Sequence, residues 1–430
     1  MEQQYIWKSP AFDTSRQPTS VYKAHLLPDP QFLGNFARSA KWCPDGSLAL
    51  AHCENRNLQY LDIMFPQAAP ILDFIWYPRA TPRDPSSFCF VASVRESPVR
   101  LLDASDGRLR ASYKIVDHRE RQIAPHSLAF NFPADKLYCG FEDAIEVFDL
   151  NRPGEGIRLA TTSSKKSKDG LKGIISALAF CPSYDPSYRL YAAGSLTPSS
   201  ANIALFDEDT GGKPVAWVGD IKASVVQLAF NPVKPHILYA SFRRYDEIWS
   251  WDLRGNTITP YQTFRRGNIS RPETNQKMKF DIDLGGDLMG IGDQASNGNV
   301  NLFKLVDDST QPATELTVEA GAEGTHHSVI TPALRFHGHD DAVGSVAFHP
   351  LRALLLSVSG SRHFEDINVR EGEKKAPLRI RQVWMRRCHE AEATECTCEN
   401  RTADGNRPSE ITHSGYGTLE RVRVVKVVQA

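Results

Sequence analysis

One short pattern recurs seven times along this chain and constrains its fold more than any other feature. The stretch "VGSVAFHP" (343–350) shows it: an apolar run ends in an aromatic residue and a turn follows. The pattern ends at seven marker residues, Trp42, Trp76, Phe130, Phe180, Phe230, Ile282 and Phe348. The markers lie 34 to 66 residues apart, about 51 on average, a little more than the roughly 40–45 residues of a WD40 blade. Such a repeat predicts one supersecondary unit per copy.

Each unit also closes on a second apolar run, which usually ends in Asp or contains Trp. These runs are "LQYLDI" (58–63), "VRLLDA" (99–104), "IEVFDL" (145–150), "IALFDE" (203–208), "WSWDLR" (249–254), "VNLFKL" (300–305) and "IRQVWM" (380–385). Two further β-like runs lie in each unit, which gives four short strands per unit. The sequence therefore predicts an all-β, seven-bladed WD40 β-propeller.

The repeats set the expected domain boundaries. We expect the propeller to occupy residues 31–387. The N-terminal segment 1–30 contains the β-like "TSVYKAHLL", a candidate for the strand that closes the ring. Residues 388–430 form a polar tail with a basic, β-like end, "TLERVRVVKVV". That end is either an edge strand or a basic patch that recruits a partner.

Two pairs of residues carry the WD40 signature. Gly338 and His339 precede the seventh marker, and Trp251–Asp252 is the one literal WD dipeptide. A catalytic role for His339 is the alternative, but we expect it to be buried and hydrogen-bonded within its own blade. We expect the same structural role for Trp251 and Asp252.

Composition and motifs argue against several classes of function. The chain has 50 basic and 51 acidic residues, so a polyanion must bind a local patch rather than the whole body. No P-loop, G-x-S-x-G or H-E-x-x-H motif is present, so we expect no enzyme, no cofactor and no small-molecule substrate. Cys388, His389, Cys396 and Cys398 do not have the usual zinc spacing, so we expect no metal site. No apolar run is long enough to predict a membrane span.

Basic residues gather in the loops between the predicted strands, several of them directly after the second strand of a unit. Phosphates bind Lys and Arg, and unpaired bases stack on aromatic or guanidinium planes. We therefore expect an RNA-binding rim, although a solvated charged surface is the simpler interpretation of any single residue. The candidates are Arg95, Arg119, Arg243, Arg244, Tyr245, Arg265, Arg266, Arg271, Lys277, Arg362 and His363.

Longer motifs connect these units to a known family. They include "ASVRESPVRLLDASDGRLRASYK" (92–114), "DEIWSWDLR" (246–254) and "TNQKMKFDIDLGGDLMGIGDQASNGNV" (274–300). Through them the chain resembles the telomerase Cajal-body WD-repeat proteins over roughly residues 30–390, as a fungal-type member. The resemblance implies a nuclear protein, in the Cajal body or the nucleoplasm. It also implies that the chain binds box H/ACA small Cajal-body RNA or telomerase RNA, together with RNP proteins.

A second class of function stays open beside RNA binding. Fungal-type relatives point to a protein-interaction scaffold in the assembly of pre-mRNA splicing snRNPs. One contiguous basic patch favours RNA, whereas dispersed arginines beside an apolar rim favour a peptide.

Overall fold

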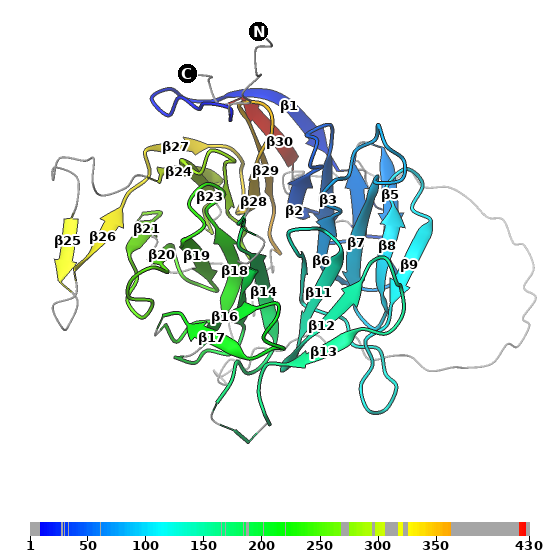
Figure 1. Ribbon diagram of the computed structural model, residues 1–430. Helices are drawn as coiled ribbons and strands as arrows, with labels where there is room; N and C mark the ends of the chain where they lie inside the picture. The colour runs from blue at the N-terminus through cyan, green and yellow to red at the C-terminus, as the bar shows by residue number, and fades with distance from the viewer. Residues whose placement is uncertain are drawn as a thin grey trace, which may run out of the picture. The chain divides into compact units, whose positions relative to one another are not determined.

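The computed structural model describes residues 9–362 and 421–426 with several gaps, namely 27–28, 30, 33, 61, 165, 168, 184, 186–188, 201, 220, 268–274, 295–296, 306–316 and 321–325. The described residues form β-strands, numbered β1 to β30, and contain no helix. Seven sheets result, and each has at least four strands (Figure 1). The predicted all-β, seven-bladed propeller is thereby confirmed.

The strands follow one order in each blade. The first strands all end at a marker residue: β2 (Ala37–Trp42), β6 (Ile71–Trp76), β10 (Ser127–Phe130), β14 (Ile175–Phe180), β18 (Val225–Phe230), β22 (Asp281–Ile282) and β28 (Val343–Phe348). The second strands are β3 (Ala49–Cys53), β7 (Cys89–Val94), β11 (Lys136–Phe141), β15 (Leu190–Ser195), β19 (Ile237–Phe242), β23 (Leu288–Gly292) and β29 (Leu354–Ser359).

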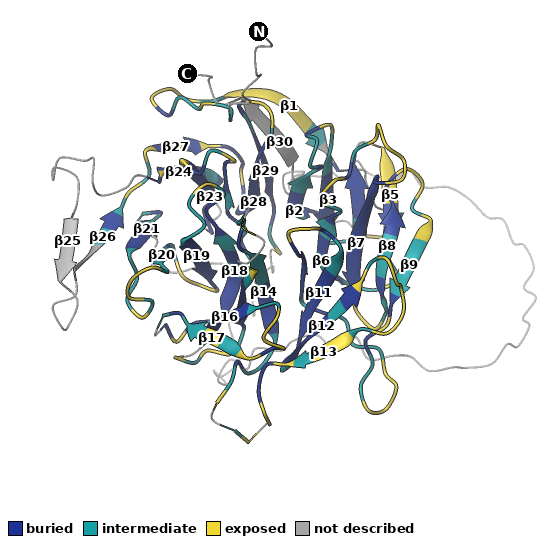
Figure 2. Cartoon of the chain, in the orientation of Figure 1, coloured by how far each residue is buried: buried dark blue, intermediate teal, exposed yellow. Residues whose placement is uncertain are grey.

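The third strands are β4 (Asn57–Tyr60), β8 (Val99–Asp103), β12 (Ala144–Asp149), β16 (Ile203–Asp207), β20 (Glu247–Asp252), β24 (Asn299–Lys304) and β30 (Arg421–Lys426). The fourth, outer strands are β5 (Ile63–Pro66), β9 (Leu109–Tyr113), β13 (Ile157–Ala160), β17 (Pro214–Trp217), β21 (Gln262–Arg265), β27 (Leu334–His337) and β1 (Thr19–His25). Burial follows this order, since β7 and β19 are wholly buried whereas β13 is mostly exposed (Figure 2).

Apolar packing between neighbouring blades forms the core. A four-stranded sheet has two faces to cover, and each blade covers a face of the next. Seven apolar clusters result, one at each junction between consecutive blades. One of them joins the last blade to the first, because Leu356 and Val358 of β29 pack with Ala37 and Ala51. The junction between the last and first blades is therefore closed by the same kind of apolar packing as the other junctions.

Hydrogen bonds between the first strands close the ring a second time. At each of the seven junctions, a polar side chain of one first strand bonds a backbone atom at the first strand of the next blade. We call this set the inner ring; its side chains are Lys41, Asp73, Ser127, Ser176, Gln227, Asp281 and Ser345. Gln227 makes two such bonds, donating to the Phe280 carbonyl and accepting from its N–H.

The seventh blade draws its strands from both ends of the chain. β30 pairs with β29 on one side and with β1 on the other, so β1 is the outer strand (Figure 1). The sequence predicted residues 380–385 for the third strand, but they lie outside the described residues and β30 takes that position. The basic C-terminal run is thus an interior strand of this sheet rather than an edge. The domain boundaries 1–30, 31–387 and 388–430 stay predictions.

The fifth blade is longer than the others. A hairpin of β25 (Thr317–Ala320) and β26 (His326–Ile330) extends it, because β26 pairs in parallel with β21. Within the part of the chain that the structure describes, no helix has the length and hydrophobicity to span a bilayer.

Candidate nucleic-acid interface

The up-and-down order of the strands sorts the loops onto two faces. Successive antiparallel strands reverse direction, so the connections between blades and the turns between second and third strands share one face. We call it the connection face. The turns between first and second strands, and those between third and fourth strands, form the opposite face.

The predicted RNA-binding residues fall on the connection face wherever the structure describes them. Arg95, Arg243, Arg244 and Tyr245 lie in turns after a second strand, and Arg362 follows β29. Arg119, Arg266 and Lys277 lie in connections between blades, and Arg265 ends β21. Arg271 and His363 lie outside the described residues.

The structure brings together the turn after β19 and the connection into the sixth blade. Arg243 donates through Nε and Nη2 to the Asn275 carbonyl, at 3.2 and 3.1 Å. Arg244 donates to the Asn275 side-chain oxygen, and its backbone has a positive φ of 65°. Lys277 lies two residues beyond Asn275, so these two loops are neighbours in the fold.

Electrostatic interactions extend this neighbourhood to the second blade. Burial lowers the pKa of Lys277; Asp73 opposes the shift, and Arg243 and Arg38 add to it. Burial also lowers the pKa of His126 to about 4, and Lys277 and Arg95 contribute. We call Arg95, Arg243, Arg244 and Lys277 the basic patch. None of the four has an ion-pair partner among the described residues.

Tyr245 borders the basic patch and offers an aromatic surface. Its ring is 39% exposed, and its other side lies against Phe242 and Trp249, with centroids 6.2 and 6.0 Å away. A ring held from behind by two aromatic rings keeps its orientation, which suits it to stack on a base.

Two of the remaining candidates on this face are held by carboxylates. Arg265 is ion-paired with Glu247, its Nε 2.8 Å from Oε1. Arg362 donates to Glu54, a carboxylate that also binds Arg38. Arg119 is exposed on the connection into the third blade. Arg265 and Arg362 are therefore less available for phosphate than the basic patch, whereas Arg119 stays exposed.

Arg266 differs from the expectation of an exposed loop arginine. Its side chain is only 2% exposed, and Nε lies 3.0 Å from Asp246 Oδ1. Its guanidinium donates to the carbonyls of Gly292, Tyr245 and Asp246. It lies at the end of an outer strand, where the turn after β19 and the sixth blade enclose it. Its contacts are those of a residue that holds this turn in place.

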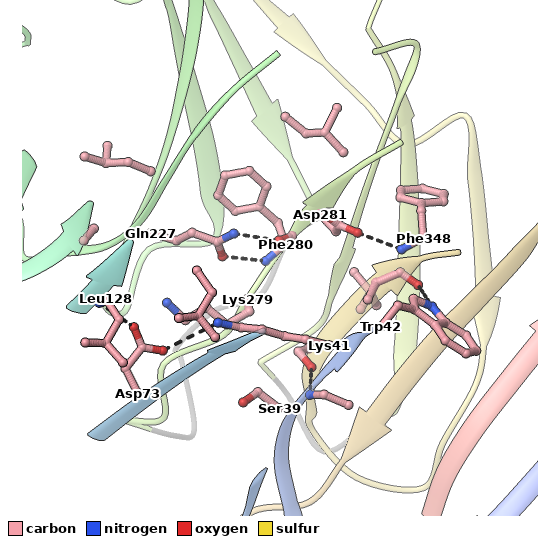
Figure 3. Close-up of a pocket in the computed structure, with 18 of the residues that line it drawn as sticks. Ser39, Lys41, Trp42, Asp73, Leu128, Gln227, Lys279, Phe280, Asp281 and Phe348 are labelled. Atoms are coloured by element: carbon pink, nitrogen blue, oxygen red, sulfur yellow. Dashed lines mark hydrogen bonds and ion pairs between the residues drawn. The ribbon is translucent and has the colours of Figure 1, made fainter. Parts of the chain in front are cut away.

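A central channel opens among the first strands of the seven blades. It has a volume of about 410 Å³, and every first strand contributes to its wall. Lys41, Asp73, Gln227, Lys279 and Asp281 carry its polar chemistry (Figure 3). The sequence analysis missed these residues. A signal was available: six of the seven positions three residues before a marker are polar, namely Ser39, Asp73, Ser127, Gln227, Lys279 and Ser345.

Burial shifts the titration of two channel residues. It lowers the pKa of Lys279 to about 7, a shift that Asp73 opposes and to which Lys277 and Lys41 add. It raises the pKa of Asp281 to about 7, against hydrogen bonds from the Phe348 and Ile282 N–H groups. Lys41 lies 3.6 Å from Asp73 Oδ1 and donates to the Phe74 carbonyl.

The WD40 signature residues lie inside the blades. His339 is 4% exposed, and its Nε2 lies 2.8 Å from Ser357 Oγ in its own blade. The Gly338 N–H donates to the Gly298 carbonyl. Trp251 is fully buried in the cluster between the fourth and fifth blades. Asp252 accepts from Arg254 in the next turn.

The opposite face exposes several apolar residues. Its first turns expose Phe132, Val233, Leu284 and Leu351, each two or three residues after a marker. Their exposed fractions run from 45% to 60%. The two faces therefore have different chemistry, one basic and one partly apolar.

The fold is that of a WD-type β-propeller. No family model matches the chain. It is 29% identical over 355 residues to "Telomerase Cajal body protein 1" of Mesocricetus auratus, covering 77% of this chain and 59% of that protein. It is 29% identical over 378 residues to the Bos taurus protein of the same name, covering 83% and 63%. The chain thus spans about three fifths of the length of these relatives.

A fungal relative has a different name. "Guanine nucleotide-binding protein negative regulator 1" of Schizosaccharomyces pombe is 26% identical over 292 residues, which cover 61% of this chain and 69% of that protein. The resemblance to telomerase Cajal-body WD-repeat proteins, predicted from the motifs, is confirmed by the similarity to the mammalian proteins.

Proposed function

We propose that this chain is an RNA-binding propeller scaffold of small nuclear ribonucleoproteins. Its RNA is a box H/ACA small Cajal-body RNA or telomerase RNA, and its site is the nucleus, in the Cajal body or the nucleoplasm. The names of the mammalian relatives support the particle and the compartment. The basic patch is the observation that carries RNA binding.

The mechanism is recognition of a few unpaired nucleotides at the connection face. Arg243, Arg244, Arg95 and Lys277 bind backbone phosphates, and Tyr245 stacks on a base. Arg95, Arg243 and Arg244 are exposed and have no carboxylate partner among the described residues, so they can exchange water and counterions for phosphate. RNP proteins hold the rest of the particle, and the apolar turns of the opposite face offer them a surface.

The test is a salt titration of RNA binding with the variant Arg243→Glu/Arg244→Glu. Each phosphate contact contributes about −0.7 to the slope of log K against log salt for a single strand. Losing two contacts should flatten the slope by about 1.4 and weaken binding at least tenfold. Arg152→Glu, an exposed arginine after β12 on the opposite face, is the matched control and should bind like the wild type. Equal binding by the double variant across the titration would refute this site.

A protein-interaction scaffold in splicing snRNP assembly is the second candidate. The exposed Phe132, Val233, Leu284 and Leu351 favour it, since apolar residues clustered on one face mark protein interfaces. If the arginine variant binds RNA normally but Leu284→Asp/Leu351→Asp loses RNP proteins from a nuclear pull-down, the scaffold function takes precedence.

A further inference from the structure

Two lysines line the central channel and a third lies near them. Lys41 and Lys279 contribute to its wall, and Figure 3 shows both side chains beside Asp73. Lys277 lies close enough to disfavour the charge on Lys279. Three ammonium groups therefore share one nearby carboxylate, Asp73. Asp281 follows Lys279 by two residues in the sequence. Burial raises the pKa of Asp281 to about 7, so this carboxyl is partly protonated near neutral pH.

The protein's own atoms satisfy these lysines incompletely. Lys279 Nζ donates to the Val226 carbonyl at 3.1 Å, and the described residues give it no other acceptor. An ammonium group has three donors, and a partly buried one without a counter-charge is costly. Lys41 takes the nearest acceptors, the Phe74 carbonyl and Asp73. A negatively charged ligand would supply both the missing acceptors and the missing charge.

We propose that the central channel, at Lys279 and Lys41 with Lys277 nearby, is a binding site for a compact oxyanion of two or more charges, such as a phosphate monoester or a pyrophosphate. Three lysines beside the single carboxylate of Asp73 favour a negatively charged ligand. The volume of about 410 Å³ is that of a small-molecule site. Lys277 belongs to the basic patch as well, but Lys279 and Lys41 are distinct from the proposed RNA contacts of Arg243, Arg244 and Tyr245. The variants Lys279→Gln and Arg243→Glu/Arg244→Glu therefore test the two sites separately.

Oxyanion binding should take up a proton. Lys279 faces Lys41 of β2, Asp73 of β6, Lys277 of its own segment and the uncharged Val226 and Ser345 of β18 and β28. An anion beside it favours the ammonium form, so its pKa rises from about 7 on binding. A doubly charged anion should consequently bind about tenfold more weakly at pH 8 than at pH 6.

The experiment measures pyrophosphate binding to the full chain by calorimetry. Lys279→Gln removes the charge but keeps a donor for the Val226 carbonyl, and it should weaken binding at least tenfold. Lys279→Arg keeps the charge and should bind within about threefold of the wild type. Lys304→Gln, an exposed lysine on β24, is the control and should have no effect. No saturable binding to the wild type, or equal binding by Lys279→Gln, would overturn the proposal.

Two further measurements complete the test. Sulfate stays doubly charged from pH 6 to 8, so its affinity for the wild-type protein reports the titration of the site without any variant. A flat pH profile would count against Lys279 as a ligand. Competition then separates the sources of the phosphate: displacement of RNA by pyrophosphate identifies an RNA phosphate in the channel, and simultaneous binding identifies a free phosphorylated ligand.

Discussion

The substitution Arg266→Glu gives a direct test of the packing beneath the connection face. The arginine is 2% exposed and donates to three carbonyls. The substitution leaves those acceptors unpaired and places a second carboxylate beside Asp246. Removing one partner of a buried ion pair costs about 3–5 kcal/mol. We therefore expect unfolding to become easier by about 4 kcal/mol, a large part of the 5–15 kcal/mol typical of a folded protein.

Urea unfolding, followed by tryptophan fluorescence, measures this difference. About 4 kcal/mol corresponds to a factor of roughly a thousand in the unfolding equilibrium constant. Arg243→Glu, an exposed arginine in the turn that Arg266 supports, is the control and should stay within about 0.5 kcal/mol of the wild type. If Arg266→Glu unfolds within 1 kcal/mol of the wild type, Arg266 is not the buried anchor described here. The result also decides which arginines can be used to test RNA binding without loss of the fold.

Three further predictions concern the ring and the channel. Asp73→Ala leaves the Leu128 N–H unpaired and should lower the free energy of unfolding by about 1–3 kcal/mol; an unchanged urea midpoint would contradict the inner ring. Deleting residues 1–26 removes β1 and leaves the edge of β30 unpaired, so we expect aggregation on size-exclusion chromatography rather than a monodisperse peak. The Lys279 pKa of about 7 lies below its unfolded value of about 10.4, so the unfolded chain binds more protons between them. Stability should therefore rise from pH 7 to pH 10, and Lys279→Gln should abolish that part of the rise in pH-dependent urea unfolding.

The markers predicted the blades because they are core residues with a fixed place in the repeat. Each ends a first strand, so an apolar run before it and a turn after it follow from local sequence alone. Local sequence alone does not predict which segment forms the third strand of the seventh blade. The run 421–426 alternates Arg and Val, a pattern that suits an edge as well as an interior position. Only its pairing with both β29 and β1 decides between the two.

In the candidate site, too, local sequence predicts some features, and others depend on contacts between distant segments. The place of Arg243 and Arg244 after a second strand predicted their face, since strand order alone sorts loops between faces. The burial of Arg266 could not be predicted from strand order. Its burial depends on Gly292 and Asp246, which come from another blade and another loop. Lys279 was missed because only the comparison of all seven repeats makes its position, three residues before a marker, stand out. Lys41 lies outside that position, in a strand that also contains Arg38 and Ser39.

The two charged surfaces should respond differently to substitution, because they are coupled differently to the fold. The arginines of the basic patch lie in turns, and their loss removes binding energy while the sheets stay packed. The channel positions belong to the first strands, and Lys41 and Asp73 both belong to the inner ring. A change at either of them alters ring closure and the charge in the channel together. The Lys279 side chain differs, because its Nζ donates to the Val226 carbonyl, which a Gln side chain can also reach. It is therefore the residue at which the charge of the channel can be changed with the least effect on the ring.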